Sequence, residues 1–579
     1  MSERHQPDAS SSSTEIDHPH EEKRLDAPKQ EPEAEQPHDA ENATEKSTEG
    51  APLDHAPSQA AKMGKNKIIV VMTALCLALF LAALDMTIIS TALPTIAAQF
   101  GASESGFSWI ASSYLLANAA CIPLWGKISD IWGRKSIIVL ANVVFLVGSL
   151  ICALAHNMAT IIAGRAVQGI GGGGIIILAN ISVSDLFSLR DRPMYYGLFG
   201  ATWAIAGALG PVIGGAFTTS VTWRWCFYLN LPVGGVSLGI LVLFLHIESP
   251  KTPFWAGLRC IDWTGTFLII GGTLMFLFGL EFGGVNYPWA SPTVICLIVF
   301  GVFTWALAMF LEWKVAKFPI IPPRLFNEWY NVLILLVCFC HGFTFIAATY
   351  YLPLYFQTVL QSSPIMSGVY VLPLVLSLAL GSTATGITMK KTGRFRELII
   401  GGMSLMALGF GLFYRPQGLR FMAPYHHLPA NIRPADMATA TATFGFVRQL
   451  STSMSVVLGT VIYQNMMSQQ SAKLIASLGA ETAAAVMASF GGSSKSLVKS
   501  LTPSQREVVF GAYTHALNRM WIFYTAMACL GFVLALFICP RELTRNHTVQ
   551  KTGLAEQERA RQELIESQRK DNSKPEIEA

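Results

Sequence analysis

Runs of about 20 apolar residues recur along this 579-residue chain, from Ile68 almost to the C-terminus. A helix of about 20 apolar residues spans the hydrocarbon core of a bilayer. The runs lack the alternating pattern of membrane β-barrel strands. They therefore predict an all-α polytopic membrane protein, in agreement with a composition of 52% hydrophobic and only 13% charged residues.

Thirteen spans are predicted from these runs. Lys and Arg are retained on the cytoplasmic side of a membrane. Seventeen of them lie before the first span and after spans two, four, six, eight and ten, whereas the five intervening loops carry only Arg224. The N-terminus is therefore expected in the cytosol. The spans lie near residues 68–97, 107–126, 136–155, 159–186, 194–218, 228–246, 263–282, 292–312, 331–357, 366–389, 397–413, 442–465 and 519–539.

The residues outside the spans narrow the class of protein further. Residues 1–67 are rich in Glu, Asp, Pro, Ser and His, which predicts a disordered acidic tail, and no cleavable signal peptide pattern precedes the first span. The net charge of +4 gives no support for nucleic-acid binding. The ten cysteines lack the paired spacing of a metal site, so no metal is expected.

The segment between the predicted spans 397–413 and 442–465 breaks the pattern of apolar runs. Residues 414–437 contain four prolines and several charges, which excludes a lipid-exposed helix there. With thirteen alternating spans, the C-terminus would lie on the opposite side of the membrane from the N-terminus.

Asp85 and Arg165 are ionisable residues that lie deep inside predicted spans. By helical rise, Asp85 is about 26 Å and Arg165 about 21 Å from the inner edge of the membrane. Both therefore belong to its outer half. We expect them to face one aqueous cavity, with Asp85 as a protonatable site and Arg165 as its partner. The alternative for Asp85 is an ordinary aspartate near the outer end of a helix.

The stretch "GKISDIWGRK" follows the second span. Gly126 and Gly133 favour a tight turn between two helices, and Asp130 can pair with Arg134 beside Lys135. These charges could hold one state closed, as a cytoplasmic gate. The alternative is an ordinary basic loop on the inner side.

The fifth span contains "GALGPVIGG". Its glycines recur at helical spacing and would allow close approach of a neighbouring helix, with a proline as a bend. This suits a helix that slides or rocks, although simple packing of small residues explains the glycines equally well. The residues are Gly207, Gly210, Pro211, Gly214 and Gly215.

Other signals are less specific. The aromatic run "TYYLPLYFQ" could line a cavity for flat organic molecules through Tyr350, Tyr351, Phe356 and Gln357, although aromatic belts at the lipid interface are also rich in Tyr. Arg448 lies a few residues into the span 442–465, where its side chain could reach the membrane surface. "GIGGGG" and "GVSLG" match nucleotide-binding and hydrolase patterns but lie inside spans. No phosphate-binding loop is present, so neither enzymatic activity nor ATP use is expected.

Taken together, "LDMTIISTALP", "GKISDIWGRK", "GRAVQGIG" and "GALGPVIGG" resemble, in this order and on these spans, the motifs of the major facilitator superfamily. The similarity is to its fourteen-span drug:proton antiporter branch and extends from about Lys67 to Pro540. "WRWCFYLNLPVGG" is similar to the entry into helix six of that family. The long acidic tail and "ATATFGFVRQLSTSMSVV" resemble fungal members that export toxins and other secondary metabolites.

This resemblance implies two six-helix bundles, at residues 68–246 and 331–540, with two extra spans within 247–330 and a cytosolic tail at 541–579. It implies that Asp85 and Arg165 couple transport to protons and that Asp130 and Arg134 form the cytoplasmic gate. Fourteen spans are expected, and the missing one should lie between Leu412 and Met437.

The expected function is proton-coupled export of amphipathic small organic molecules such as toxins, drugs or secondary metabolites. We expect a monomer without cofactor, in the plasma membrane or the vacuolar membrane. One alternative is a vacuolar carrier of basic amino acids or iron chelates with the same fold. Another is a membrane sensor that transports nothing.

Overall fold

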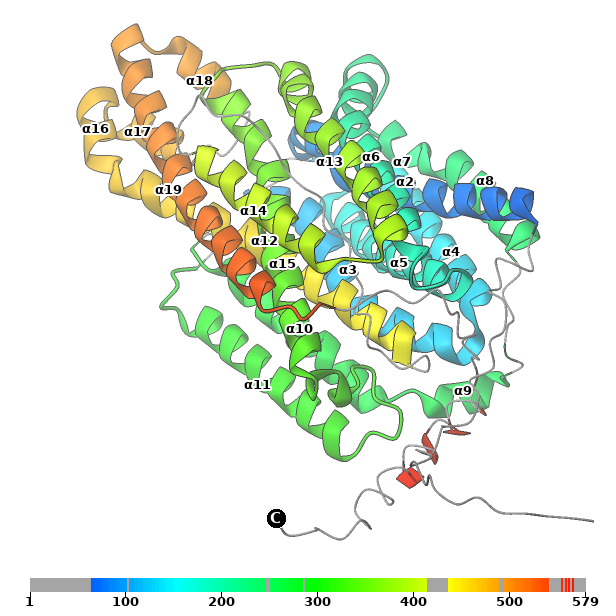
Figure 1. Ribbon diagram of the computed structural model, residues 1–579. Coiled ribbons are helices and arrows are strands. Elements are labelled where there is room, and N and C mark those ends of the chain that lie inside the picture. Colours follow the sequence, from blue (N-terminus) through cyan, green and yellow to red (C-terminus); the bar gives the residue numbers. More distant parts are fainter. Residues whose placement is uncertain are drawn as a thin grey trace, which may run out of the picture. The chain divides into compact units, whose positions relative to one another are not determined.

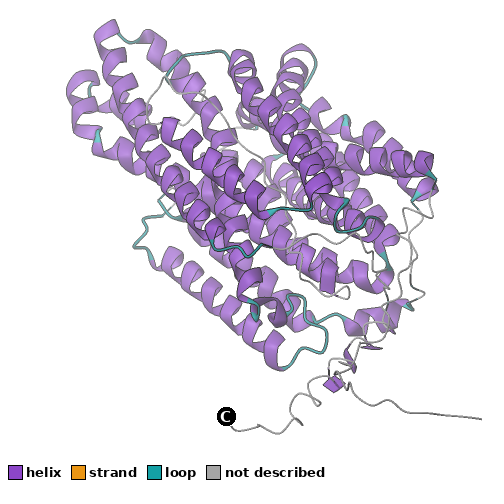
Figure 2. Ribbon diagram, viewed as in Figure 1, coloured by secondary structure: helices purple, strands orange, loops and turns teal. Residues whose placement is uncertain are grey.

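The computed structural model describes residues 64–100, 104–245, 250, 252–284, 287–413, 436–488, 494–540 and scattered residues from 553 to 566. The chain divides into two units, Met1–Leu53 and Asp54–Ala579. All described residues belong to Asp54–Ala579, and Met1–Leu53 lies outside them. Residues 1–63 of the predicted disordered tail and most of the segment 414–437 therefore also lie outside them, whereas residues 65–67 of that tail already belong to a helix. Within the described part, the chain consists of helices joined by short loops (Figure 2).

The first six predicted spans fall on helices that contact mainly one another (Figure 1). Among these contacts, α2 packs against α6 and α8, and α5 packs against α3 and α4. We call these helices the first helix group. They are α2 (Lys65–Gln99), α3 (Glu104–Trp132), α4 (Arg134–Ala153), α5 (Met158–Leu186), α6 (Arg192–Ser220), the short α7 (Trp225–Tyr228) and α8 (Asn230–Phe244).

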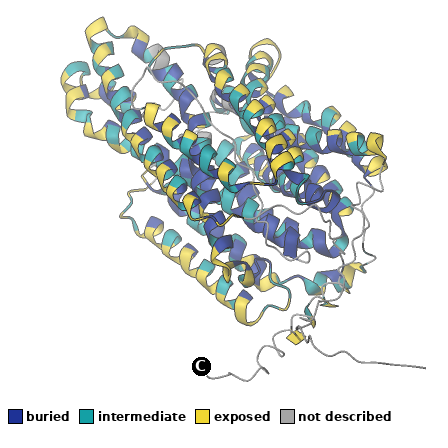
Figure 3. Ribbon diagram, in the orientation of Figure 1, coloured by how far each residue is buried: buried dark blue, intermediate teal, exposed yellow. Residues whose placement is uncertain are grey.

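A pair of helices follows the short α9 (Phe254–Cys260). In this pair α10 (Trp263–Phe282) lies beside α11 (Pro292–Lys314), and α10 also contacts α3. Most residues of α11 are exposed, and its ribbon is largely yellow in Figure 3. The 3-10 turn η1 (Pro323–Phe326) connects this pair to the remaining helices.

The remaining helices form what we call the second helix group. Here α12 packs against α15 and α19, and α14 packs against α19. The group consists of α12 (Trp329–Thr358), α13 (Pro364–Thr392), α14 (Arg396–Phe413), α15 (Met437–Gln469) and α19 (Pro503–Leu536), with the short α16 (Ser471–Leu478), α17 (Ala480–Ala488) and α18 (Ser494–Ser500) between the last two.

Eleven of the described helices are long and apolar enough to cross a membrane. The two other predicted spans, 107–126 and 442–465, fall within α3 and α15. Thr, Ser, Gln and Arg lower the hydropathy of α15, and many of its Thr and Ser residues are buried. This helix is packed against α3, α5, α10, α12 and α19, so its polar side chains face protein rather than lipid.

Glycines in α5 allow its neighbours to approach at backbone distance. A Cβ atom added at Gly169 would collide with the backbone of Tyr114 in α3, and one added at Gly171 would collide with the backbone of Phe145 in α4. The run "GIGGGG" is therefore a helix-packing surface. It fixes α5, which carries Arg165, tightly between α3 and α4.

The turn between α3 and α4 consists of one residue, Gly133, with a φ of 88° that glycine adopts without strain. We call the side of the helices at which this turn lies the Arg134 end. Helix α13 ends there, because Arg190 Nε donates to the carbonyl oxygen of Lys390 at 3.0 Å. Helix α15 begins there, because Arg192 Nη1 lies 3.5 Å from Met437 Sδ.

Helices α14 and α15 therefore both start at the Arg134 end. The end of α19 lies there too, since Arg396 Nη2 donates to the carbonyl oxygen of Leu536 at 3.1 Å. Gly553 N also donates to the carbonyl oxygen of Asp130 at 3.0 Å. Thirteen alternating spans would instead place the C-terminal end on the opposite side. The alternation does not hold at α15, which starts at the same end as α14, and residues 414–435 between them lie outside the described residues.

Candidate functional site

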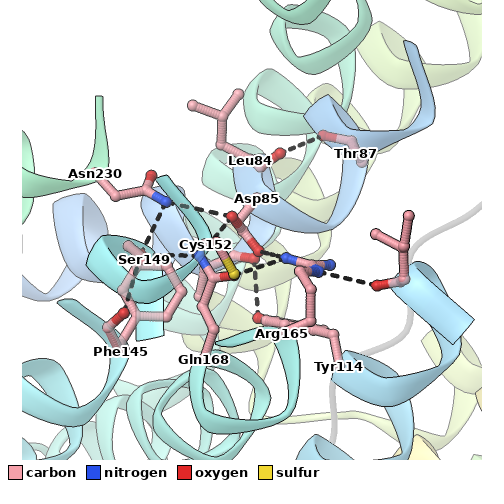
Figure 4. A network of polar contacts seen from close by, with 12 residues as sticks. Leu84, Asp85, Thr87, Tyr114, Phe145, Ser149, Cys152, Arg165, Gln168 and Asn230 are labelled. Atoms are coloured by element: carbon pink, nitrogen blue, oxygen red, sulfur yellow. Dashed lines mark hydrogen bonds and ion pairs between the residues drawn. The ribbon is translucent and has the colours of Figure 1, made fainter. Parts of the chain in front are cut away.

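Asp85 of α2 and Arg165 of α5 form an ion pair inside the first helix group (Figure 4). Arg165 Nη1 donates to Asp85 Oδ2. Each residue is only 1% exposed. The sequence placed both residues at similar depth, and the structure brings them into direct contact.

The second oxygen of Asp85 is held by two amide side chains. Gln168 Nε2 donates to Asp85 Oδ1 at 2.7 Å, and Asn230 Nδ2 of α8 donates to it at 3.2 Å. Both amides also contact Ser149 Oγ of α4, at 2.8 and 3.2 Å. The Ser149 hydroxyl in turn donates to the carbonyl oxygen of Phe145 at 2.9 Å. Figure 4 shows these side chains converging on one carboxylate from α2, α4, α5 and α8.

Arg165 is fixed by α3 as well as by Asp85. Its Nε donates to the carbonyl oxygen of Ile110 at 3.1 Å, and its Nη1 donates to Gln168 Oε1 at 2.8 Å. Its Cζ lies 4.4 Å from the centroid of the Tyr114 ring, a distance suited to a cation–π contact. The guanidinium group is therefore positioned by an ion pair, two hydrogen bonds and an aromatic face.

This arrangement fits the ionised form of Asp85. Arg165, Gln168 and Asn230 all donate to the carboxylate, and an ionised carboxylate only accepts. A proton added to Asp85 would neutralise the partner of a buried arginine, which is costly. We expected the pair to face an aqueous cavity, but in this conformation both side chains are enclosed. The reason is that α2, α3, α4, α5 and α8 all contribute contacts to the network.

A second buried cluster surrounds Arg134 at the start of α4. Arg134 Nη1 lies 2.5 Å from Asp130 Oδ1, and Nε lies 2.7 Å from Asp185 Oδ2 of α5. Nη1 also donates to Ser129 Oγ at 2.9 Å. The sequence paired Asp130 with Arg134 but missed Asp185. Lys135 is not part of this cluster, and its side chain makes no hydrogen bond or ion pair with any residue that the structure describes.

The two helix groups contact each other along α6 and α13 and along α3 and α15, and some of these contacts lie at the Arg134 end. Gly126 of α3 packs against α15, where an added Cβ would lie 2.5 Å from Ala442 Cβ. Ser382 Oγ of α13 donates to the carbonyl oxygen of Gly197 in α6 at 3.0 Å. Lys390 Nζ also lies 3.1 Å from Asp191 Oδ1. Helices α3 and α6 thus meet α15 and α13 respectively, at the end that also holds Arg134.

The glycine-rich helix predicted from "GALGPVIGG" is α6, and two of the four glycines in this motif contact a neighbour closely. Gly210 and Gly214 pack against α2, where an added Cβ at Gly214 would lie 2.5 Å from the carbonyl oxygen of Ile88. Gly207 and Gly215 have nothing within 4 Å of an added Cβ. Pro211 lies on another face, where its Cβ would be 3.9 Å from a Cβ added at Gly368 of α13.

The aromatic run does not form a single lining surface. Tyr351 is buried, and its hydroxyl donates to the carbonyl oxygen of Val456 at 2.5 Å. Phe356 is also buried and stacks edge-on against Tyr370. The expectation that Tyr351 and Phe356 line a cavity is wrong for this conformation, because both belong to the core of the second helix group. Tyr350 is exposed, and Gln357 Nε2 lies 3.4 Å from Ser367 Oγ.

The described residues contain no group of three or more His, Cys, Asp and Glu side chains that could hold a metal ion. Five of their buried ionisable groups, Asp85 with Arg165 and Arg134 with Asp130 and Asp185, form ion pairs within a bundle of long apolar helices. In membrane proteins, such groups mark paths for ions and substrates. The fold and the site define a polytopic helical membrane transporter.

The chain belongs to the Major Facilitator Superfamily, whose sequence pattern matches residues 75–503. It is therefore a transporter and not an enzyme. The resemblance drawn from the four motifs is confirmed, as is the all-α membrane fold.

Fungal transporters of similar length match most of the chain. It is 48% identical over 512 residues to Efflux pump dotC of Dothistroma septosporum, covering 85% of this chain and 88% of the relative. It is 45% identical over 542 residues to the MFS-type transporter ppz2 of Metarhizium majus, covering 90% and 93%. The solved structure of the proton:xylose symporter XylE is 15% identical, with 84% of this chain and 100% of that chain covered and a TM-score of 0.47.

Proposed function

We propose that this transporter is a proton-coupled antiporter that exports amphipathic small organic molecules such as toxins, drugs or secondary metabolites. The names of similar fungal proteins, among them Efflux pump dotC, support export. The observation that carries proton coupling is the buried Asp85 carboxylate, which accepts hydrogen bonds from Arg165, Gln168 and Asn230.

A proton on Asp85 would change the balance of charges inside the first helix group. The protonated carboxyl would turn one acceptor into a donor and would leave Arg165 without its counter-charge. Because two discrete arrangements of this network would differ in charge, protonation can bias the helix group between two conformations. Substrate release and proton uptake would then be coupled through the same five helices.

The Arg134 cluster is the proposed gate. Contacts between α3 and α15 and between α6 and α13 hold the two helix groups together at that end. Transport would proceed as these groups rock against each other, with residues 68–246 and 331–540 as the moving halves. Residues 247–330 would supply the two additional spans. In this proposal Gly126, Gly133 and Arg134 form the turn and the latch of the gate.

The predicted orientation places the Arg134 end and the N-terminus in the cytosol. The proton gradient would drive export without ATP, and each charge moved is worth about 2.3 kcal/mol per 100 mV of potential. We propose a monomer in the plasma membrane, with the vacuolar membrane as the other possible location. Asn546 tests this orientation, since the acceptor pattern "NHT" should remain without glycan if this tail is cytosolic.

The test uses cells in which the gene is deleted and mass spectrometry of the small molecules that they retain. Re-expression of the full chain should release the retained compounds, and a protonophore should block that release. The variant Asp85→Asn should be present in the membrane but should not restore export. Release by Asp85→Asn at the normal rate would refute its role in coupling.

Glu281→Gln provides a matched control. Glu281 also lies within a span, in α10, where its carboxylate accepts from Ser112 Oγ at 2.7 Å without an arginine partner among the described residues. This variant should restore export. If Glu281→Gln lost proton coupling while Asp85→Asn still exported, the proton-binding residue would be Glu281 of α10 rather than Asp85.

A further inference from the structure

Arg448 lies deep within the second helix group. The sequence placed it near the start of a span at residue 442, but α15 begins at Met437. Arg448 is therefore 11 residues, or about 16 Å, from the start of the helix at 1.5 Å per residue. This is about half the thickness of a hydrocarbon core, too deep for a side chain that only reaches for the membrane surface.

The Arg448 guanidinium makes no hydrogen bond or ion pair with any of the described residues. Only its backbone carbonyl is engaged, by the hydroxyl groups of Ser451 and Thr452 at 2.7 and 2.9 Å. The adjoining segment 414–435 contains neither Asp nor Glu, so it offers no carboxylate as a counter-charge. An arginine at this depth normally has a partner. Arg448 differs in this respect from Arg134 and Arg165, which are both paired.

The neighbours of Arg448 on α15 define the direction of its side chain. Gly445 packs against Ile122 of α3 and Ile177 of α5. Ser451 packs against Gly342 of α12, and an added Cβ at that glycine would lie 3.4 Å from Arg448 Cγ. At about 100° per residue, Arg448 projects between these two contacts. It therefore points toward the region between the first helix group and α12, and its side chain is partly exposed there.

A further polar group lies at the same depth without a partner in the described part of the chain. Gln449 Nε2, one residue further along α15, is buried and unbonded. An unsatisfied polar group inside a protein is costly, and a bound molecule is one way to satisfy it.

We propose that Arg448 binds the negatively charged group of the transported molecule, so that the substrates of this transporter are organic anions that carry a carboxylate or phenolate. The guanidinium offers a planar pair of donors that matches a carboxylate. Gln449 adds a donor beside it. This inference rests on the proposed export of small organic molecules and specifies their charge.

The experiment compares two xanthene dyes of similar shape and opposite charge, fluorescein and rhodamine 123. The purified full chain is placed in nanodiscs of phosphatidylcholine, which contain no anionic lipid, and binding is measured by fluorescence anisotropy. Fluorescein should bind more tightly than rhodamine 123. Arg448→Gln should weaken fluorescein binding by about tenfold or more, whereas Arg448→Lys should retain part of it.

Arg519→Gln is the matched control, because Arg519 of α19 is exposed and the same charge is removed. It should leave fluorescein binding unchanged, and the melting temperature of each variant shows whether it is folded. Equal fluorescein binding by the original chain and folded Arg448→Gln, or no fluorescein binding at all, would overturn the proposal. Binding is measured without a proton gradient. If fluorescein binding depends on Arg448 but a proton gradient does not drive dye transport in proteoliposomes, the proposed antiport is refuted and the proposed anion site is not.

Discussion

Lys390 Nζ of α13 lies 3.1 Å from Oδ1 of Asp191, the residue that precedes α6. The pair connects the two helix groups, but both side chains are 41% exposed. Because water and salt screen exposed ion pairs, we expect a coupling energy below about 1 kcal/mol. A double-mutant cycle with Asp191→Asn and Lys390→Gln, measured by thermal unfolding at low and high salt, tests this value. A coupling above about 2 kcal/mol that persists in high salt would contradict it.

Arg134→Ala should destabilise the protein far more than disruption of that exposed pair. The substitution leaves two buried carboxylates, Asp130 and Asp185, without their shared cation. Breaking a buried ion pair from one side costs about 3–5 kcal/mol. Thermal unfolding of the purified protein should show this loss, while the neighbouring substitution Lys135→Ala should change stability by less than about 0.5 kcal/mol. Similar unfolding temperatures for the two variants would argue against a structural role for the cluster.

Adjacent glycines of α6 should respond differently to the same added methyl group. At Gly214 a Cβ would lie 2.5 Å from the Ile88 backbone oxygen of α2, whereas at Gly215 nothing lies within 4 Å. Gly214→Ala should therefore force α2 and α6 apart, at a cost of about 1–3 kcal/mol, and reduce transport. Gly215→Ala should be neutral or stabilising by up to about 1 kcal/mol. Equal effects of both substitutions on unfolding temperature would show that the α2–α6 contact is not tight.

The sequence predicted the helices well because a lipid environment imposes one simple rule on each of them. Every predicted span falls on a described helix, since about 20 apolar residues can cross a bilayer only as a helix or within a closed barrel. The direction of α15 could not be predicted in this way. Charge counting assumes that each span reverses the last, and the position of Met437 beside Arg192 follows from tertiary contacts.

The candidate site was only partly visible in the sequence. Charged residues inside apolar runs, such as Asp85 and Arg165, stand out because their insertion is costly. The neutral partners Ser149 and Asn230 carry no such signal, since Ser and Asn are tolerated in spans for many reasons. Gln168 could have been found, because it lies three residues after Arg165 and thus on the same helical face.

The last prediction concerns the two partners of the buried ion pair. Asp85→Asn alone should cost about 3–5 kcal/mol, because it leaves the buried Arg165 guanidinium without a counter-charge and turns an amide toward it. Arg165→Met alone should cost a similar amount, because the Asp85 carboxylate then loses its cation.

Combining Asp85→Asn with Arg165→Met should restore much of the lost stability. The amide oxygen of the new Asn can still accept from Gln168 and Asn230, which both donate to Oδ1, and a methionine fills the volume of the arginine without charge. The double variant should therefore unfold at a higher temperature than either single variant, although none of the three should couple transport to protons. If the destabilisation of the double variant equals the sum of the single effects, the two side chains do not act as a pair, and the network around Asp85 would have to be held together by Gln168 and Asn230 alone.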